Sequence, residues 1–134
     1  MLKLIFCVRR LRHLSAEEFH RYWLQSHGPL VREVAPLLKI RRYVQSHSFS
    51  DPRITQALAA RQCRGESFDG IAELWWDSIE DIVAVGACAE ARAAGRRLLE
   101  DEKRFIDLAS SALFYSHEHV VIGESWPADA VGGT

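Results

Sequence analysis

The chain has 134 residues, of which 48% are hydrophobic and 26% are charged, and these proportions are typical of one globular domain with a substantial core. Its formal net charge of −1 argues against the concentrated basic surface that a nucleic-acid-binding domain needs. We therefore expect no nucleic-acid partner.

The cysteines and the apolar runs indicate the cellular compartment of the protein. Cys7, Cys63 and Cys88 are odd in number and widely spaced, which matches neither a disulfide framework nor a zinc-binding pattern. The first apolar run, Leu2 to Val8, is too short to cross a bilayer, and basic residues follow it where a secretory signal has them first. The sequence therefore predicts a cytoplasmic protein without a membrane segment.

The first two predicted elements are a strand and an amphipathic helix. Alternating side chains predict a strand from Leu2 to Arg9, with one face in the core. The helix begins at Ser15, because Ser15 and Glu18 have the spacing of a capping box, in which each side chain accepts a hydrogen bond from a backbone N–H of the first turn. Residues at three- and four-residue spacing then form an aromatic stripe that carries one imidazole: Phe19, Tyr22, Trp23, His27 and Leu30.

His27 is the residue of this stripe with the clearest capacity for chemistry. Pro29 has no N–H for the carbonyl of Gln25, and Gly28 is biased away from helical dihedrals, so we expect the helix to end or kink at His27. The helix dipole favours the charged form of the imidazole, whereas burial favours the neutral form. With these opposing effects the imidazole is a candidate to titrate near neutral pH, where it is useful as an acid or a base. The alternative, which spacing alone favours, is a packed core histidine that donates one N–H to a carbonyl freed by the proline.

The next stretch is predicted to hold a short helix, a strand and a long connection. Pro29 opens a second helical segment that Pro36 closes, and Leu38 to His47 alternates as a strand whose polar mixture suits an edge or a groove. Residues 48–68 break the pattern, with two helical turns between Ile54 and Gln62. A connection of this length is either a lid or binding loop, or a tolerated surface excursion, and both interpretations stay open.

The strand predicted from Ile71 to Trp76, after a turn at Asp69 and Gly70, is apolar on both faces. One side carries Ala72, Leu74 and Trp76, and the other carries Ile71, Glu73 and Trp75. Since a half-buried strand covers one core only, the second face must be covered by more protein or by a ligand. Glu73 on that face would be partly desolvated and thus a candidate general acid or base; the alternative is a carboxylate at the rim, paired with an arginine and catalytically idle.

Two helices and a last strand are predicted in the C-terminal half. Ser78 with Asp81 caps a helix that reaches Gly86, and a second helix runs from Ala89 to about Ile106, with the charged run Glu100 to Arg104 on a solvated face.

The last predicted strand, Leu113 to Ile122, places Tyr115, His117 and His119 on one side. Two histidines at this spacing suit a metal, but no third ligand is near, so polar residues beside solvent are the preferred interpretation. Residues 123–134 are predicted to be a flexible tail in which Trp126 docks on the domain.

The predicted order is strand, helix, strand, strand, helix, helix, strand. This is the split βαβ layout of a ferredoxin-like α+β sandwich with an antiparallel four-stranded sheet, here one domain of residues 1–122. Because its helices cover one sheet face only, the apolar second face of residues 71–76 predicts packing against a second copy of the chain. We therefore expect a homodimer.

Five segments are informative together. They are EEFHRYWLQSHGPLV (Glu17–Val31), RRYVQSH (Arg41–His47), FDGIAELWWDS (Phe68–Ser78), DEKRFID (Asp101–Asp107) and EHVVIG (Glu118–Gly123). In this order and spacing they resemble the EthD domain family, named after a protein of bacterial ethyl tert-butyl ether degradation. The positions that match the recurrent polar and aromatic pattern of that family are Tyr22, Trp23, His27, Asp69, Gly70, Glu73 and Asp101.

The resemblance implies a dimeric α+β barrel, in which two ferredoxin-like sheets pack face to face. It also implies relatives in xenobiotic degradation and in fungal polyketide pathways, some of which are called dehydratases or decarboxylases. The name carries no accepted catalytic set.

Two functions are consistent with these residues. In the first, the chain is an enzyme that acts without a cofactor or metal on an aromatic, polyketide-like or xenobiotic compound, as a lyase, dehydratase or isomerase. Its predicted catalytic residues are His27, Glu73 and Tyr22. An apolar pocket between sheet and helices is predicted to bind the substrate through Trp23, Tyr43, Trp75 and Tyr115. In the second, the chain is a noncatalytic dimeric ligand-binding or accessory protein of an oxidative degradation pathway.

Overall fold

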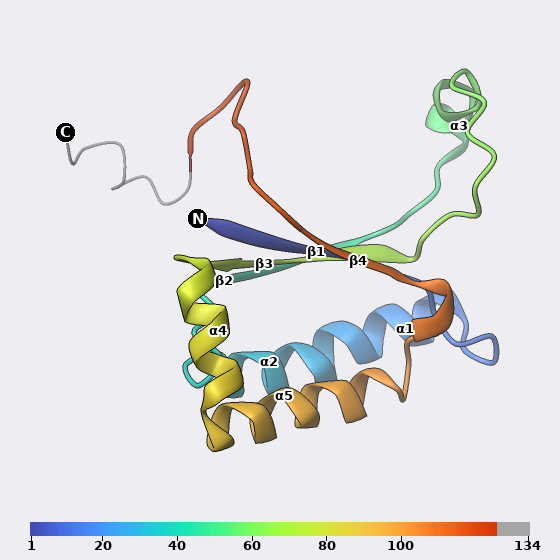
Figure 1. Ribbon diagram of the computed structural model, residues 1–134. Coiled ribbons are helices and arrows are strands. Elements are labelled where there is room, and N and C mark those ends of the chain that lie inside the picture. Colours follow the sequence, from blue (N-terminus) through green and yellow to red (C-terminus); the bar gives the residue numbers. More distant parts are fainter. Residues whose placement is uncertain (126–134) are drawn as a thin grey trace.

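An antiparallel sheet of four strands forms the frame of the molecule (Figure 1). The computed structural model describes residues 1–125. The strands lie in the order β2-β3-β1-β4, and their bounds are Leu2–Val8 for β1, Arg42–His47 for β2, Gly70–Trp76 for β3 and Ala112–Ser116 for β4. Because β3 and β4 pair antiparallel with β1, and β2 pairs antiparallel with β3, the sheet confirms the predicted ferredoxin-like fold.

The helices lie mainly on one side of this sheet. They are α1 (Ala16–Tyr22), α2 (Gly28–Val34), α3 (Pro52–Ala59), α4 (Ile79–Ala87) and α5 (Ala89–Glu102), with a short 3₁₀ turn at Leu108–Ser110. Figure 1 shows α1, α2 and α5 beneath one face of the sheet, α4 at one end, and α3 beyond the opposite face. None of the helices in residues 1–125 combines the length and hydrophobicity that a membrane crossing needs.

The core consists of two clusters between the sheet and the helices. The first joins α1 and the segment after α5 to the sheet, through Val8, Phe19, Trp23, Ala72, Phe105 and Ile106. The second joins α2 to α5, through Val31, Val34, Leu38, Ala91, Ala94 and Leu98. Tyr43 of β2 packs against both clusters.

The first long helix does not end at His27. Residues Trp23–His27 form a π-helical turn that continues directly into α2, and the N–H of Gly28 donates to the carbonyl of Trp23, five residues earlier. The side-chain amide of Gln45 donates to the same carbonyl at 2.9 Å. The sequence predicted an end or a kink at His27, and only the end is wrong. The chain widens into a π-helical turn at this point, which accommodates Pro29 and holds both Trp23 and His27 in the core.

Strands β2 and β4 and helix α5 have bounds that differ from the sequence prediction. Strand β2 begins at Arg42 instead of Leu38, because the chain first turns through Lys39, whose φ of 57° is left-handed. Strand β4 ends at Ser116 instead of Ile122, because Ser116 already pairs with Lys3 near the start of β1. Helix α5 ends at Glu102 instead of Ile106. Trp126 and the rest of the predicted tail from that position on lie outside the described residues.

Residues 48–68 form an exposed excursion. Helix α3 has no buried residue, and Asp51 caps it by accepting a hydrogen bond from the N–H of Arg53. Phe49 and Leu58 are 77% and 66% exposed. The excursion lies on the opposite side of the sheet from α1, α2 and α5 (Figure 1).

Candidate functional site

A cavity of about 510 Å³ lies between the sheet and the helices. Its sheet wall includes Leu4, Phe6, Leu74, Trp76 and Tyr115, and its helix wall includes Trp23, His27, Val31, Leu98 and Glu102. Apolar and aromatic side chains dominate the lining, and a few polar groups interrupt it. A cavity of this size and character suits a small organic molecule.

His27 lies in the cavity wall with a carboxylate behind it. Its Nδ1 is 2.8 Å from Oδ2 of Asp101, near the end of α5. The hydroxyl of Tyr22 donates to the other oxygen of the same carboxylate, at 2.5 Å. Since a carboxylate only accepts, His27 carries its proton on Nδ1, and Nε2 is the free acceptor. Within residues 1–125, no side chain or backbone group hydrogen-bonds to that Nε2.

The surroundings keep this imidazole neutral. Burial lowers the pKa of His27, and the hydrogen bond and charge of Asp101 only partly oppose this effect. A neutral imidazole with Nδ1 held by a carboxylate presents a basic Nε2, which is the arrangement of a general base.

Tyr22 acts behind the carboxylate instead of in the cavity. Burial, followed by the hydrogen bond to Asp101, raises the pKa of the Tyr22 hydroxyl. The hydroxyl therefore remains a donor that orients Asp101. Tyr22 lines a separate depression on the outer side of α1, together with Leu14 and Arg21, and it is not part of the cavity wall.

Glu102 is a cavity residue that the sequence analysis missed. Burial raises the pKa of its carboxyl to about 7, and the charge of Asp101 adds to the effect. The sequence predicts that the charged run Glu100 to Arg104 faces solvent, and this prediction is wrong at Asp101 and Glu102, which are partly buried. The signal was present in the spacing, since Glu102 follows Leu98 by four residues on the apolar stripe of α5.

The sequence-predicted site residues divide between the two sheet faces. Trp23, Tyr43 and Tyr115 line the cavity together with His27, and burial raises the pKa of the Tyr43 hydroxyl to about 12. Glu73 and Trp75 do not line it.

Glu73 and Trp75 lie on the outer face of the sheet. Glu73 accepts a hydrogen bond from Lys3 at 2.8 Å, and Trp75 donates to Glu118 at 3.3 Å, with Lys3 and Arg42 over its ring. The prediction that both residues share the pocket of His27 is wrong, because successive side chains of β3 alternate and Trp76 has the inward position. The alternative predicted for Glu73 is a carboxylate paired with an arginine; the carboxylate is paired, but its partner is Lys3.

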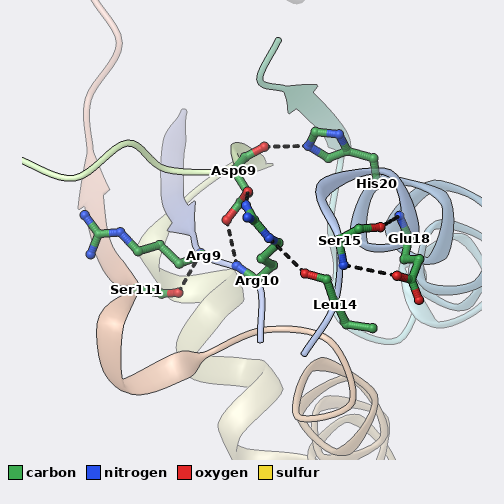
Figure 2. A network of polar contacts seen from close by, with 8 residues as sticks. All are labelled: Arg9, Arg10, Leu14, Ser15, Glu18, His20, Asp69 and Ser111. Atoms are coloured by element: carbon green, nitrogen blue, oxygen red, sulfur yellow. Dashed lines mark hydrogen bonds and ion pairs between the residues drawn. The ribbon is translucent and has the colours of Figure 1, made fainter. Parts of the chain in front are cut away.

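Asp69 and Gly70 belong to the scaffold (Figure 2). The Asp69 carboxylate accepts hydrogen bonds from the backbone N–H of Arg10 at 2.8 Å and from its guanidinium at 2.5 Å, and the Asp69 carbonyl accepts one from His20 at 2.7 Å. A Cβ at Gly70 would lie 2.6 Å from the ring of Trp23. The hydrogen bonds of Asp69 and the close packing at Gly70 therefore hold the end of β1, the start of β3 and helix α1 together beside the cavity.

The histidine pair considered as a metal site lies outside the sheet. His117 and His119 follow β4 and are exposed. Residues 1–125 contain no group of three or more His, Cys, Asp or Glu side chains arranged to hold a metal ion.

Comparison with known families gives the same picture as the fold. The model of the EthD domain matches residues 11–109. The chain belongs to the EthD domain family. No curated protein matches it by sequence.

Solved structures agree on the fold. An ethyl tert-butyl ether degradation (EthD) family protein of Bacillus halodurans is 18% identical, with a TM-score of 0.58 over 89% of this chain and 99% of that one. An EthD-like protein of Ralstonia eutropha is 16% identical, with a TM-score of 0.56 over 90% and 94%. A dimeric protein of unknown function and ferredoxin-like fold from Bacteroides fragilis is 15% identical, with a TM-score of 0.53 over 87% and 95%.

Proposed function

We propose that this EthD protein is an enzyme that moves protons on a small organic compound, with His27 as general base and no cofactor. The observation that carries this proposal is the His27 imidazole in the wall of an apolar cavity, with its Nδ1 bound to Asp101 at 2.8 Å. Proton transfer of this kind needs only side chains, and the aromatic lining suits an aromatic, polyketide-like or xenobiotic substrate. The reaction is then of the lyase, dehydratase or isomerase type.

The chemistry follows from the charges around the imidazole. Nε2 of His27 takes a proton from the bound compound, and the imidazolium that forms lies beside the Asp101 carboxylate. In a cavity with few polar groups this attraction is stronger than in water, so the carboxylate stabilises the charge that develops. Tyr22 is a positioning residue in this scheme, because its hydroxyl contacts Asp101 and not the cavity.

A variant pair tests the proposal. Wild type, His27→Gln and the control His13→Gln, which alters an exposed histidine, are incubated with a panel of aromatic and polyketide-like carbonyl compounds. The mass and structure of each compound are then followed by liquid chromatography, mass spectrometry and NMR. One positioned base contributes a factor of about 10² to 10⁴, so His27→Gln should lose that much turnover while His13→Gln loses none.

Three outcomes separate the alternatives. Wild-type turnover in a folded His27→Gln protein refutes the proposed base. Loss of the folded circular dichroism spectrum identifies His27 as a packing residue, and Asp101→Asn then tests the base with the imidazole still in place. Ligand that is retained unchanged by the wild type favours the noncatalytic binding or accessory protein, for which the same apolar cavity is the supporting observation.

We also propose that the protein is located in the cytoplasm and that it forms a homodimer. The two copies pair through the outer face of the sheet. That face carries Ile5, Val44, Ile71 and Phe114, of which Ile71 and Phe114 are 36% and 49% exposed. The dimeric neighbour from Bacteroides fragilis supports the pairing. Phe114→Asp should shift the sedimentation coefficient from dimer to monomer, whereas Val83→Asp, on the exposed side of α4, should leave it unchanged. Equal behaviour of the two variants contradicts this interface.

A further inference from the structure

Two adjacent carboxyl groups of α5 have opposite environments. Asp101 accepts hydrogen bonds from Tyr22 and His27. Glu102 lies in the cavity wall with Leu98, Leu99 and Ile106. Within the described part of the chain its carboxyl makes neither a hydrogen bond nor an ion pair. An ionised carboxylate in such a place is costly unless donors compensate it. A carboxyl kept there without a partner is placed to contact whatever fills the cavity.

We propose that Glu102 is the general acid of this site and that it acts with His27 on an enolisable carbonyl compound. This inference rests on the proposed function, because it takes His27 as the base. Its own basis is that both side chains line one apolar cavity, the imidazole with a free Nε2 and the carboxyl with no partner in the protein.

The proton transfers balance without another reactant. Nε2 of His27 takes a proton from the carbon next to the carbonyl, and the electrons of that C–H bond form a carbon–carbon double bond. The carbonyl oxygen takes the proton of Glu102 and becomes an enol hydroxyl, which leaves an imidazolium and a carboxylate. Return of the two protons, to a carbon and to Glu102, gives the ketone with its hydrogen exchanged or moved.

The protonation states required for this step coexist over an interval of pH. Burial lowers the pKa of His27, so the imidazole is free to accept, and burial raises the pKa of Glu102 to about 7, so the carboxyl still holds its proton. The charge of Asp101 adds to the effect of burial on Glu102. Burial, with a smaller contribution from the charge of Glu102, raises the pKa of the Tyr43 hydroxyl to about 12, so this hydroxyl stays neutral. The exchange rate should therefore have a maximum below about pH 7 and should fall as Glu102 ionises.

Hydrogen exchange tests the pair directly. The probe is 2-tetralone in deuterated buffer, and ¹H NMR measures loss of its α-proton signals above the buffer background at pH 5 to 9. The variants are Glu102→Gln, which has nearly the same shape, His27→Gln, and the control Glu100→Gln on the exposed side of α5. We expect Glu102→Gln to slow exchange by about 10² or more and to abolish the decline above about pH 7. Glu100→Gln should match the wild type.

The outcomes distinguish failure of the acid from failure of the base. Wild-type rate and an unchanged alkaline decline in Glu102→Gln overturn the acid and leave His27 standing. A uniform loss of rate with an unchanged pH profile shows that Glu102 only maintains structure. Wild-type rate in His27→Gln refutes the proposed function, and no exchange by the wild type overturns the pair for such ketones. A ¹³C carboxyl titration without substrate must also show a group near pH 7 that Glu102→Gln removes; its absence overturns the acid.

Discussion

Replacement of Glu102 by glutamine should make the protein progressively more stable, relative to the wild type, as the pH rises from 4 to above 7. In the folded chain, burial raises the pKa of this carboxyl from its ordinary 4.5 to about 7. Between these values the unfolded chain loses its proton while the folded chain retains it. The folded state therefore binds more protons, and wild-type stability falls as the pH rises through this interval.

The size of the effect follows from the two pKa values. The interval from 4.5 to about 7 corresponds, at about 1.4 kcal/mol per pH unit, to about 3 kcal/mol of unfolding free energy. Because glutamine does not titrate, the unfolding free energy of Glu102→Gln does not fall in this way as the pH rises. Relative to the wild type, the variant should gain about 3 kcal/mol between pH 4 and pH 7.5. Any constant cost of burying the amide cancels, because the comparison is between two pH values.

Urea unfolding of both proteins at pH 4, 5.5 and 7.5 measures this change. The control is Glu100→Gln, whose side chain is 68% exposed and whose ion pair with Lys103 is of the surface type. Its effect should stay within about 0.5 kcal/mol at every pH. A stability difference between wild type and Glu102→Gln that does not change with pH would refute the burial argument. It would also show that Glu102 does not retain the proton that a general acid needs near neutral pH.

Three further predictions concern the scaffold and the base. Gly70→Ala places a Cβ 2.6 Å from the ring of Trp23 and should lower the unfolding free energy, measured in urea, by about 1 to 3 kcal/mol. The control Gly86→Ala meets open space in α4 and should raise the unfolding free energy by about 0.5 to 1 kcal/mol. Equal effects of the two variants would contradict the close contact at Gly70. Ser15→Ala removes the acceptor for the first turn of α1 and should lower the unfolding free energy by about 1 kcal/mol, with a neutral result excluding the cap. Burial lowers the pKa of His27 from its ordinary 6.5, so below that pH the unfolded chain binds more protons than the folded chain, and the unfolding free energy should fall as the pH drops. His27→Gln should make the unfolding free energy depend less on pH in this range. A pH dependence identical to that of the wild type would show that His27 is not its source.

The sequence predicted the elements of this fold because each has a local signal. The capping box at Ser15 starts α1 as expected, and alternation in residues 71–76 correctly separates the two faces of β3. Helical spacing likewise places Trp23 and His27 on one stripe, and the structure buries both at the cavity.

Local signals failed where the answer depends on a distant partner. Alternation shows that Glu73 and Leu74 point to opposite faces, but not which face meets the helices; only the packing of α1, α2 and α5 makes Leu74 and Trp76 the inner residues. The end or kink predicted at His27 is a π-helical turn, and Gln45 of strand β2 also donates to the carbonyl of Trp23 within it.

The sequence by itself determined the order of the elements, the family and a buried histidine in the first helix. The tertiary structure decided what that histidine does, because Asp101 is 74 residues away along the chain and reaches His27 only when α5 packs beside the π-helical turn. The same packing partly buries the Glu102 side chain in the cavity wall. Periodicity records which side of a helix is apolar, whereas the partner of a polar group and its exposure are set by contacts between elements, and these exist only in the folded chain.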